Sequence, residues 1–252
     1  MKRIAKLVFV VSLLTLSAIL AGATPAEDQT PLYDELLQQY VKDGQVDYTG
    51  LKKKEAQLDV YLGYLATTDP AQLSEKDRFA FFINAYNAYT IKLILTNFEN
   101  GQPPASINDI GSFFKKPWSI QFVKIGGRTY TLDNIEHDIL RPTFKDPRVH
   151  FAVNCASKSC PPLLSEPYSG ENLDQQLDAN TRAFIANSQE NRLEGDTLSV
   201  SAIFKWFKED FAYDPVGFFE KYAEGDLQKE LAARTDQLKL KYLDYDWSLN
   251  GK

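Results

Sequence analysis

The chain has 252 residues and a formal net charge of −6, because 34 Asp and Glu residues outnumber 28 Lys and Arg residues. An acidic protein of this kind is a poor candidate for binding nucleic acid or an anionic membrane surface. Hydrophobic residues make up 44% of the chain and aromatic residues 13%, which excludes a disordered protein and indicates a sizeable globular core.

The N-terminus has the three parts of a cleavable signal peptide. Basic residues open the chain, residues 7–20 form an apolar run, and residues 21–23 (AGA) offer the small-x-small cleavage pattern. The run has about 14 residues, whereas a membrane-spanning helix needs roughly 20. We therefore predict a signal peptide over residues 1–23, a flexible mature N-terminus over residues 24–30, and a periplasmic or secreted protein with no membrane span after cleavage.

Helical periodicity recurs along the rest of the chain. The strongest helix begins at Ser74, where Asp77 completes an approximate capping box. This helix is apolar on most sides, so we expect it to be buried in the middle of the fold. Helices are predicted over residues 32–42, 51–65, 74–97, 133–141, 172–186, 201–210 and 215–222.

Alternating and short extended runs predict the strands. Gly126-Gly127 joins two of them as a two-residue hairpin. Strands are predicted over residues 121–125, 128–132, 148–154, 192–200 and 238–245. Helices first, then a hairpin, then mixed elements indicate the α+β class, with a helix-rich N-terminal half packed on a small mixed or antiparallel sheet. No linker divides the chain, so we predict a single globular domain over residues 31–250.

Both cysteines and both histidines fall between His137 and Cys160, which makes this window the first place to look for chemistry. Cys155 sits where a predicted strand meets a turn and is the best candidate nucleophile. In a straight strand His150 would lie about 16 Å away on the opposite face. We therefore favour His137 as the catalytic base and give His150 a supporting or substrate-facing role.

Several polar side chains could complete such a site. Asn154, Asn84 or Asn87 could orient a histidine or donate to an oxyanion. Asn84 and Asn87 share one face of an apolar helix and could instead clamp that helix to a loop. Arg141 lies one turn after His137 and could bind a substrate carboxylate, although an ion pair with a neighbouring acidic residue is the simpler interpretation.

Two other interpretations of the same window remain open. Cys155 and Cys160 could form a disulfide, which persists in exported proteins and would block a thiol nucleophile. Alternatively His137, His150, Cys155 and Cys160 could bind zinc, although their spacing matches none of the usual zinc motifs. The nucleotide-binding, zinc-protease and serine-hydrolase signatures are absent, and the sequence predicts no cofactor and identifies no partner.

Four runs carry a resemblance to a known family: FFINAYNA at residues 81–88, DNIEH at 133–137, DPRVHFAVNCAS with SCPPL between residues 146 and 163, and YDWSLN at 245–250. They resemble the motifs of the domain of unknown function 547. The resemblance implies that His137, Arg141, His150, Cys155 and Cys160 belong to a shared motif, but it implies no activity. The leading hypothesis is a thiol-dependent hydrolase or acyl transferase; the alternatives are a binding or scaffold domain with a disulfide and, third, a zinc-binding domain.

Overall fold

The structure is a computed structural model that describes residues 27–112, 116–234 and 238–252. The predicted signal peptide and residues 24–26 of the predicted flexible N-terminus lie outside the described residues. Within those ranges, no helix has both the length and the apolar character that crossing a bilayer requires.

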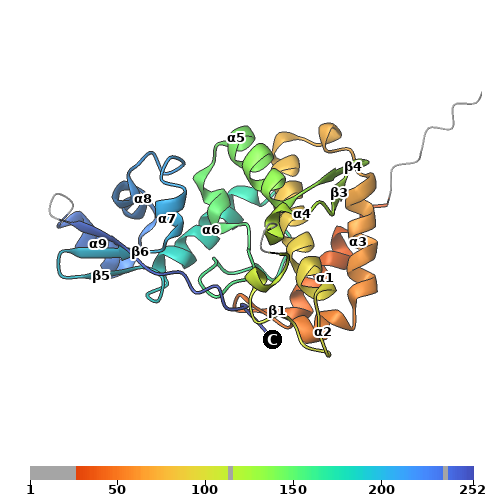
Figure 1. Cartoon of the computed structure of the whole chain (residues 1–252). Coiled ribbons are helices and arrows are strands. Elements are labelled where there is room, and N and C mark those ends of the chain that lie inside the picture. The colour runs from red at the N-terminus through yellow and green to blue at the C-terminus, as the bar shows by residue number, and fades with distance from the viewer. Residues whose placement is uncertain (1–26, 113–115, 235–237) are drawn as a thin grey trace, which may run out of the picture.

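Helices dominate the N-terminal half, and Figure 1 shows them gathered on one side of the molecule. α1 to α3 come first and α4 follows as the longest helix. α5 and α6 lie between this group and the C-terminal elements (Figure 1). The bounds are α1 Thr30–Tyr40, α2 Tyr48–Lys52, α3 Glu55–Thr67, α4 Glu75–Thr96, α5 Arg141–Phe144, α6 Leu173–Ala186, α7 Ile203–Trp206, α8 Pro215–Tyr222 and α9 Gly225–Ala232.

The predicted capping and burial of α4 are confirmed. The Ser74 hydroxyl accepts a hydrogen bond from the Asp77 backbone N–H at 3.2 Å, which satisfies one of the free donors at the helix start. From Phe79 to Leu95 all but one of the side chains are buried, so the helix is surrounded by packing on every side. α4 is thus the element around which the N-terminal half is built.

The sheets are small. β1 Val41–Lys42 pairs with β2 Gln45–Val46, and β3 Val123–Ile125 pairs with β4 Arg128–Tyr130, both antiparallel. A three-stranded sheet has the order β5-β6-β7, in which the first pair is antiparallel and the second parallel. Its strands are β5 Arg192–Glu194, β6 Thr197–Val200 and β7 Lys239–Tyr242. The molecule is therefore an α+β domain with a small mixed sheet, as the sequence predicted.

The prediction of one strand over residues 192–200 is wrong in detail, because Gly195 turns the chain at a φ of +57° and makes a hairpin of it. The helix predicted over residues 51–65 is likewise divided into α2 and α3. The hairpin at Gly126-Gly127 is confirmed. Its turn amides donate to the carbonyl groups of Leu65 and Ala66 at the end of α3, at 3.3 and 2.8 Å.

The strand predicted over residues 148–154 is also wrong. This segment begins with the 3-10 helix η5, Pro147–Phe151, and Asp146 caps it by accepting from the Arg148 N–H at 2.9 Å. Proline at the first helical position favours the helical start. The alternation of the sequence is misleading because both sides of the segment are buried: His150 is 3% exposed and Phe151 is 1% exposed.

The helix predicted over residues 133–141 exists, but its start and end differ. A π-helical segment, η4, spans Asn134–Leu140, and α5 continues it past Pro142. The Asp133 side chain does not cap this segment. Instead Thr131 and Asn134 exchange two hydrogen bonds of 3.1 and 2.9 Å between side chain and backbone.

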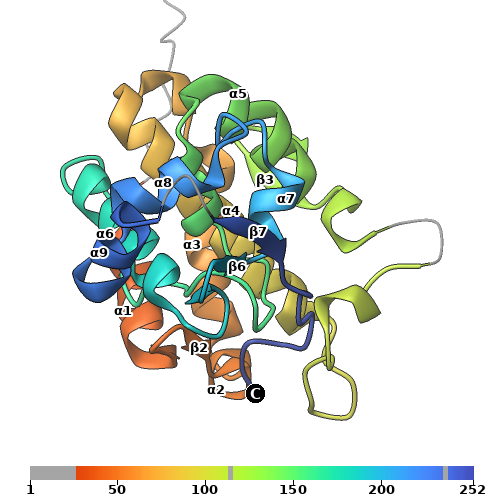
Figure 2. The same ribbon diagram turned by 90° about the vertical axis from the view of Figure 1, so that its left-hand side faces the viewer.

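Two hydrophobic clusters make up the core. The larger one surrounds α4, and the smaller one, rich in phenylalanine, includes Phe151, Phe184, Phe204 and Phe219. Figure 2 views the molecule from the side of α8 and α9, which cover this smaller cluster. Phe151 belongs to the second cluster while its neighbour Ala152 belongs to the first, so η5 joins the two.

Residues 243–252 form a C-terminal segment that runs from β7 back to the N-terminal half (Figure 1). Backbone hydrogen bonds fix its course: Lys158 donates to Ser248 at 2.8 Å, Asn250 donates to Ala156 at 3.1 Å, and Val46 donates to Asn250 at 3.1 Å. Gly251 is required at its end, because a Cβ there would lie 1.9 Å from the Val46 carbonyl oxygen.

Buried amides clamp α4 to later parts of the chain. Asn84 exchanges two 2.8 Å hydrogen bonds with the backbone of Tyr168. Asn87 donates to the Ala152 carbonyl at 2.9 Å and accepts from the Asn154 N–H at 2.8 Å. These contacts are the helix-to-loop clamps that the sequence left open as an alternative.

We expect Asn87→Ala to lower the free energy of unfolding by about 3 kcal/mol, because it leaves one buried carbonyl and one buried N–H without partners. Urea denaturation checks this. Asn172→Ala is the matched control: Asn172 is exposed and its side chain caps nothing, so a change within about 0.5 kcal/mol is expected. Equal stabilities of the two variants would contradict the clamp.

Candidate functional site

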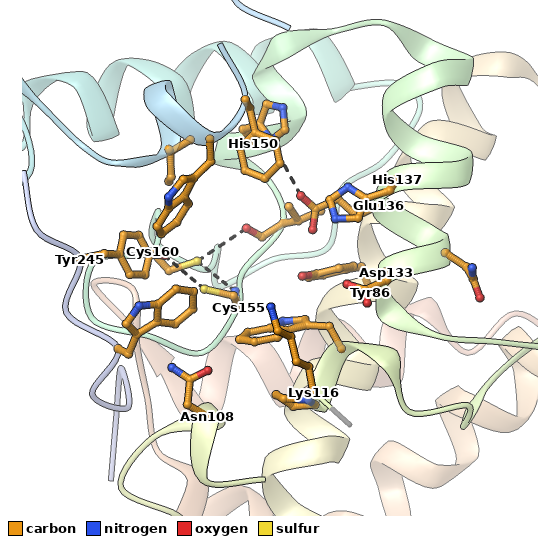
Figure 3. A pocket seen from close by; sticks show the side chains of 18 of the residues that line it. Tyr86, Asn108, Lys116, Asp133, Glu136, His137, His150, Cys155, Cys160 and Tyr245 are labelled. Carbon is orange, nitrogen blue, oxygen red and sulfur yellow. Dashed lines mark hydrogen bonds and ion pairs between the residues drawn. The ribbon is translucent and has the colours of Figure 1, made fainter. Parts of the chain in front are cut away.

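A cavity of about 840 Å³ opens between the two hydrophobic clusters, and Figure 3 shows its labelled side chains. Tyr245 lies on one side of it, and Asp133, Glu136 and His137 lie on the opposite side (Figure 3). Both cysteines lie between them. The lining comes from α4, η4, η5, α7, the loops around residues 108–118 and 153–161, and the C-terminal segment.

A tight turn presents Cys155 to the cavity. Asn154 holds this turn: its side chain accepts from the Ala156 N–H at 2.9 Å and donates to the Pro161 carbonyl at 2.8 Å. Ala156 adopts a positive φ of +62°, which is uncommon for a residue with a Cβ. The Cys155 N–H donates to the Cys160 Sγ at 2.9 Å, so the two cysteines face each other across the turn.

Polar groups surround the Cys155 sulfur. The Ser157 Oγ lies 3.1 Å from it and the Tyr245 hydroxyl 3.2 Å from it, and these two hydroxyl groups are 3.0 Å apart. Tyr245 comes from the C-terminal segment, 90 residues further along the chain. The sulfur therefore has hydrogen-bond donors from two separate parts of the chain.

These donors lower the pKa of the Cys155 thiol to about 7. The largest cause is the hydrogen bond from the Cys160 side chain, which outweighs the opposing effect of burial; Ser157 and Tyr245 add to it. The pKa of the Cys160 thiol is raised, first by burial and then by its neighbour Cys155. Cys155 is therefore the thiol of the pair that loses its proton first. Both thiols are free, and no disulfide joins them.

His137 lines the same cavity as Cys155, from the opposite wall (Figure 3). The Arg141 Nη1 lies 3.3 Å from its Nδ1. An arginine can only donate, so Nδ1 accepts and the neutral ring carries its proton on Nε2. The cavity brings His137 and Cys155 together, but the hydrogen-bond partners of the Cys155 sulfur are Ser157 and Tyr245.

His150 is buried beside Phe207, with ring centroids 4.0 Å apart. Its Nε2 lies 2.7 Å from the Asp210 carboxylate. Its Nδ1 is buried without a hydrogen-bond partner and lies 3.9 Å from the Glu136 Oε1. His150 is therefore held firmly on one side and faces an acidic residue of the cavity on the other.

Arg141 forms an ion pair, as the simpler interpretation of the sequence required, but its partner is distant in sequence. Its Nε and Nη2 contact the two carboxylate oxygens of Asp210 at 2.6 and 3.1 Å. Hydrogen bonds from His150 and then Arg141 hold the pKa of Asp210 well below its usual range, against an opposing effect of burial. Asp210 thus links the two motif residues His150 and Arg141.

The other polar residues that the sequence singled out lie away from the cavity wall. The amide groups of Asn84, Asn87 and Asn154 bond to backbone groups, so in this structure they shape the turn and the helix contacts. The four-residue zinc site also does not form. Across the described residues, no three His, Cys, Asp or Glu side chains come close enough together to hold a metal ion.

Sequence reasoning missed several cavity residues. Tyr245 and Trp247 lie in the closing run of the family resemblance, which was one available signal. All three tryptophans of the chain line the cavity, and a chain with only three could have drawn attention to them. Asp210 carried no signal, because Glu209-Asp210 has the pattern of an ordinary charged surface.

The fold and the site define an α+β domain with a thiol of lowered pKa in an aromatic-lined cavity. Residues 70–185 match the family described as "Protein of unknown function, DUF547". The chain therefore carries a domain of the DUF547 family, and the match includes His137, Arg141, His150 and both cysteines. No curated protein and no solved structure matched the chain.

We expect Tyr245→Phe to raise the pKa of the Cys155 thiol above about 7, by about one pH unit, because the thiolate loses a hydrogen-bond donor. The midpoint of the alkylation rate of Cys155 against pH, read by peptide mass, measures it. Tyr242→Phe, further back in β7, is the control and should leave the midpoint unchanged. An unchanged midpoint in Tyr245→Phe would show that this hydroxyl does not stabilise the thiolate.

We expect Asp210→Asn to lower the free energy of unfolding at pH 7 by about 2 kcal/mol, since it weakens the hydrogen bonds to Arg141 and His150. The folded pKa of Asp210 is lowered, so its stabilisation is complete above the unfolded pKa of about 3.9 and is lost as pH falls below it. Thermal unfolding from pH 7 to pH 3 should show the difference from the unmodified protein shrinking at the acidic end. The exposed Asp244→Asn should show no such difference.

Proposed function

We propose that this domain is a thiol-dependent hydrolase or acyl transferase in which Cys155 is the nucleophile. One observation carries the proposal: the Cys155 sulfur lines a cavity of about 840 Å³ and has a pKa of about 7. An ordinary cysteine has a pKa of about 8.5 and is mostly protonated at neutral pH. Near pH 7 a large fraction of Cys155 is therefore the thiolate, which is the nucleophilic form.

The proposed reaction has two steps. The Cys155 thiolate attacks an acyl carbon, so a C–S bond forms and the bond to the leaving group breaks. The leaving group takes a proton from Nε2 of His137, which enters this step as the imidazolium and leaves it as the neutral ring. Water or an acceptor amine then attacks the thioester, gives its proton to His137 and releases Cys155 as thiolate.

Ser157, Tyr245 and Cys160 support this role for Cys155 by donating to the thiolate, a task that an imidazolium performs in other thiol enzymes. His137 is the proposed acid and base because it lines the cavity opposite the thiol. His150 has Asp210 on its Nε2, and we give it a positioning role next to Glu136.

A binding or scaffold domain closed by a Cys155–Cys160 disulfide is the second candidate. The contact between the two cysteines favours it, since an oxidant that accepts two electrons could join the two sulfurs while both thiol protons are released. The proposed location outside the cytoplasm, periplasmic or secreted, rests on the signal-peptide pattern of residues 1–23 and would expose the pair to such oxidants. The thiol enzyme and the binding domain therefore differ in the redox state of Cys155 and Cys160.

We expect one acyl group per chain when the protein, purified without reductant, meets an activated ester such as p-nitrophenyl acetate at pH 7. Intact mass and peptide mapping should place it on Cys155, with a burst of nitrophenolate. Cys155→Ala should abolish the burst and keep the thermal stability within a few degrees. Cys160→Ser retains a donor to the thiolate and should keep a burst.

Two results would contradict a nucleophilic Cys155. No acylation and no alkylation before reduction, with two alkyl groups after it, would mean a disulfide and favour the binding domain. Free thiols that react no faster than a cysteine in a short peptide would contradict the activated nucleophile.

A further inference from the structure

We propose that the cavity beside Cys155 binds a cationic amine of the substrate, an ammonium or guanidinium group on an aliphatic stem, between an aromatic wall and an acidic wall. The inference rests on the proposed function, since it names the chemistry of the substrate or acceptor that the thiol would serve. Apart from Tyr245 and His150, it uses residues that the proposed acyl transfer leaves without a role.

The aromatic wall consists of Trp118, Trp206, Tyr245 and Trp247. Trp247 is the centre of this wall: its ring centroid lies 4.5 Å from that of Tyr245, 5.7 Å from that of Trp206 and 5.6 Å from that of Trp118. Trp206 is 47% exposed, which is unusual for so large an apolar side chain. An indole face is the best aromatic partner for a cation, and it also packs well against an aliphatic stem.

The acidic wall consists of Asp133, Glu136 and Asp138, all of which line the cavity. None of the three forms an ion pair with a lysine or arginine of the described ranges. Their hydrogen-bond partners are neutral: Ser119 for Asp133 at 2.6 Å, Asn134 for Asp138 at 2.7 Å, and the Tyr86 hydroxyl for Glu136. Among the described residues of the lining, Lys116 is the one lysine, so their negative charge exceeds their positive charge.

An unpaired acceptor marks where the cation would be held. His150 donates through Nε2 to Asp210, so in the neutral ring Nδ1 is an acceptor, and it is buried without a partner. The Glu136 Oε1, a second acceptor, lies 3.9 Å from it, and the Glu136 side chain is only 12% exposed. In this state of the ring two buried acceptors face each other, and a donor bound between them would satisfy both. An ammonium group brings three donors and a positive charge that the Glu136 carboxylate attracts.

The charge of the cavity decides between ligand classes. A neutral sugar could also stack on the tryptophans, but it would leave the carboxylate of Glu136 without a counter-charge. An anionic ligand would be repelled by the acidic wall. A cation satisfies the aromatic faces, the carboxylates and the histidine together.

The tryptophans provide the test, because all three in the chain line this cavity and selectively excited tryptophan fluorescence therefore reports on it alone. Cadaverine is titrated into the protein and followed by fluorescence and calorimetry, with pentanol as the neutral probe of similar length and cellobiose as the sugar. We expect cadaverine to bind at least tenfold more tightly than pentanol. Equal affinities, or binding of cellobiose without cadaverine, would overturn the proposal.

Variants locate the bound cation. Glu136→Gln and Trp206→Ala should each weaken cadaverine binding by about tenfold. Glu230→Gln, an exposed acid on α9, is the matched control and should not change it. Unchanged binding in both cavity variants would place the amine elsewhere and contradict the two walls.

The outcome is separable from that of the acylation experiment. Cys155→Ala should bind cadaverine with unchanged affinity, because the thiol is not part of either wall. Binding of the amine without acylation of Cys155 would remove the proposed reaction and keep the cation site. Acylation of Cys155 without selective amine binding would remove the cation site and keep the proposed reaction.

Discussion

The hydrogen bond between the Tyr245 hydroxyl and the Cys155 sulfur depends on the return of the C-terminal segment to the N-terminal half. The segment leaves β7, passes the turn that carries Cys155 and pairs with Val46. On its way it brings Tyr245 and Trp247 to the cavity. Without it the Cys155 sulfur would lose a hydrogen-bond donor and the cavity would lose much of its aromatic wall, so the lowered pKa of Cys155 depends on this long-range contact.

A second long-range contact orders the opposite wall. Asp210, from the phenylalanine-rich cluster, pairs with Arg141 and with His150. The contact with Asp210 fixes the His150 ring so that its Nδ1 faces Glu136. The ion pair of Arg141 with Asp210 leaves the Arg141 Nη1 able to donate to His137. One carboxylate therefore sets the orientation of both histidines, although Asp210 has the sequence pattern of a surface residue.

The two cysteines explain why the site supports two different hypotheses. Cys160 lowers the pKa of Cys155 by donating to it, and the same proximity would let an oxidant join them. A reactive thiolate with a neighbouring thiol is also the arrangement that oxidation attacks most readily. The proposed reaction and the disulfide are thus mutually exclusive states of one pair, and the state found in the purified protein distinguishes them.

The sequence by itself determined the local features, because each depends on residues close together in the chain. The cap of α4 at Ser74, the hairpin at Gly126-Gly127, the α+β class and the family motifs could be predicted from short patterns. The strand predicted over residues 148–154 failed for the same local reason: alternation stops being informative once both sides of a segment are buried and an Asp-Pro start favours a helical turn. Only the tertiary structure decided that Asp210 faces His150 and that Tyr245 faces Cys155, 60 and 90 residues away. Contacts between such distant residues are set by how the two hydrophobic clusters pack, and no pattern within one element encodes that packing.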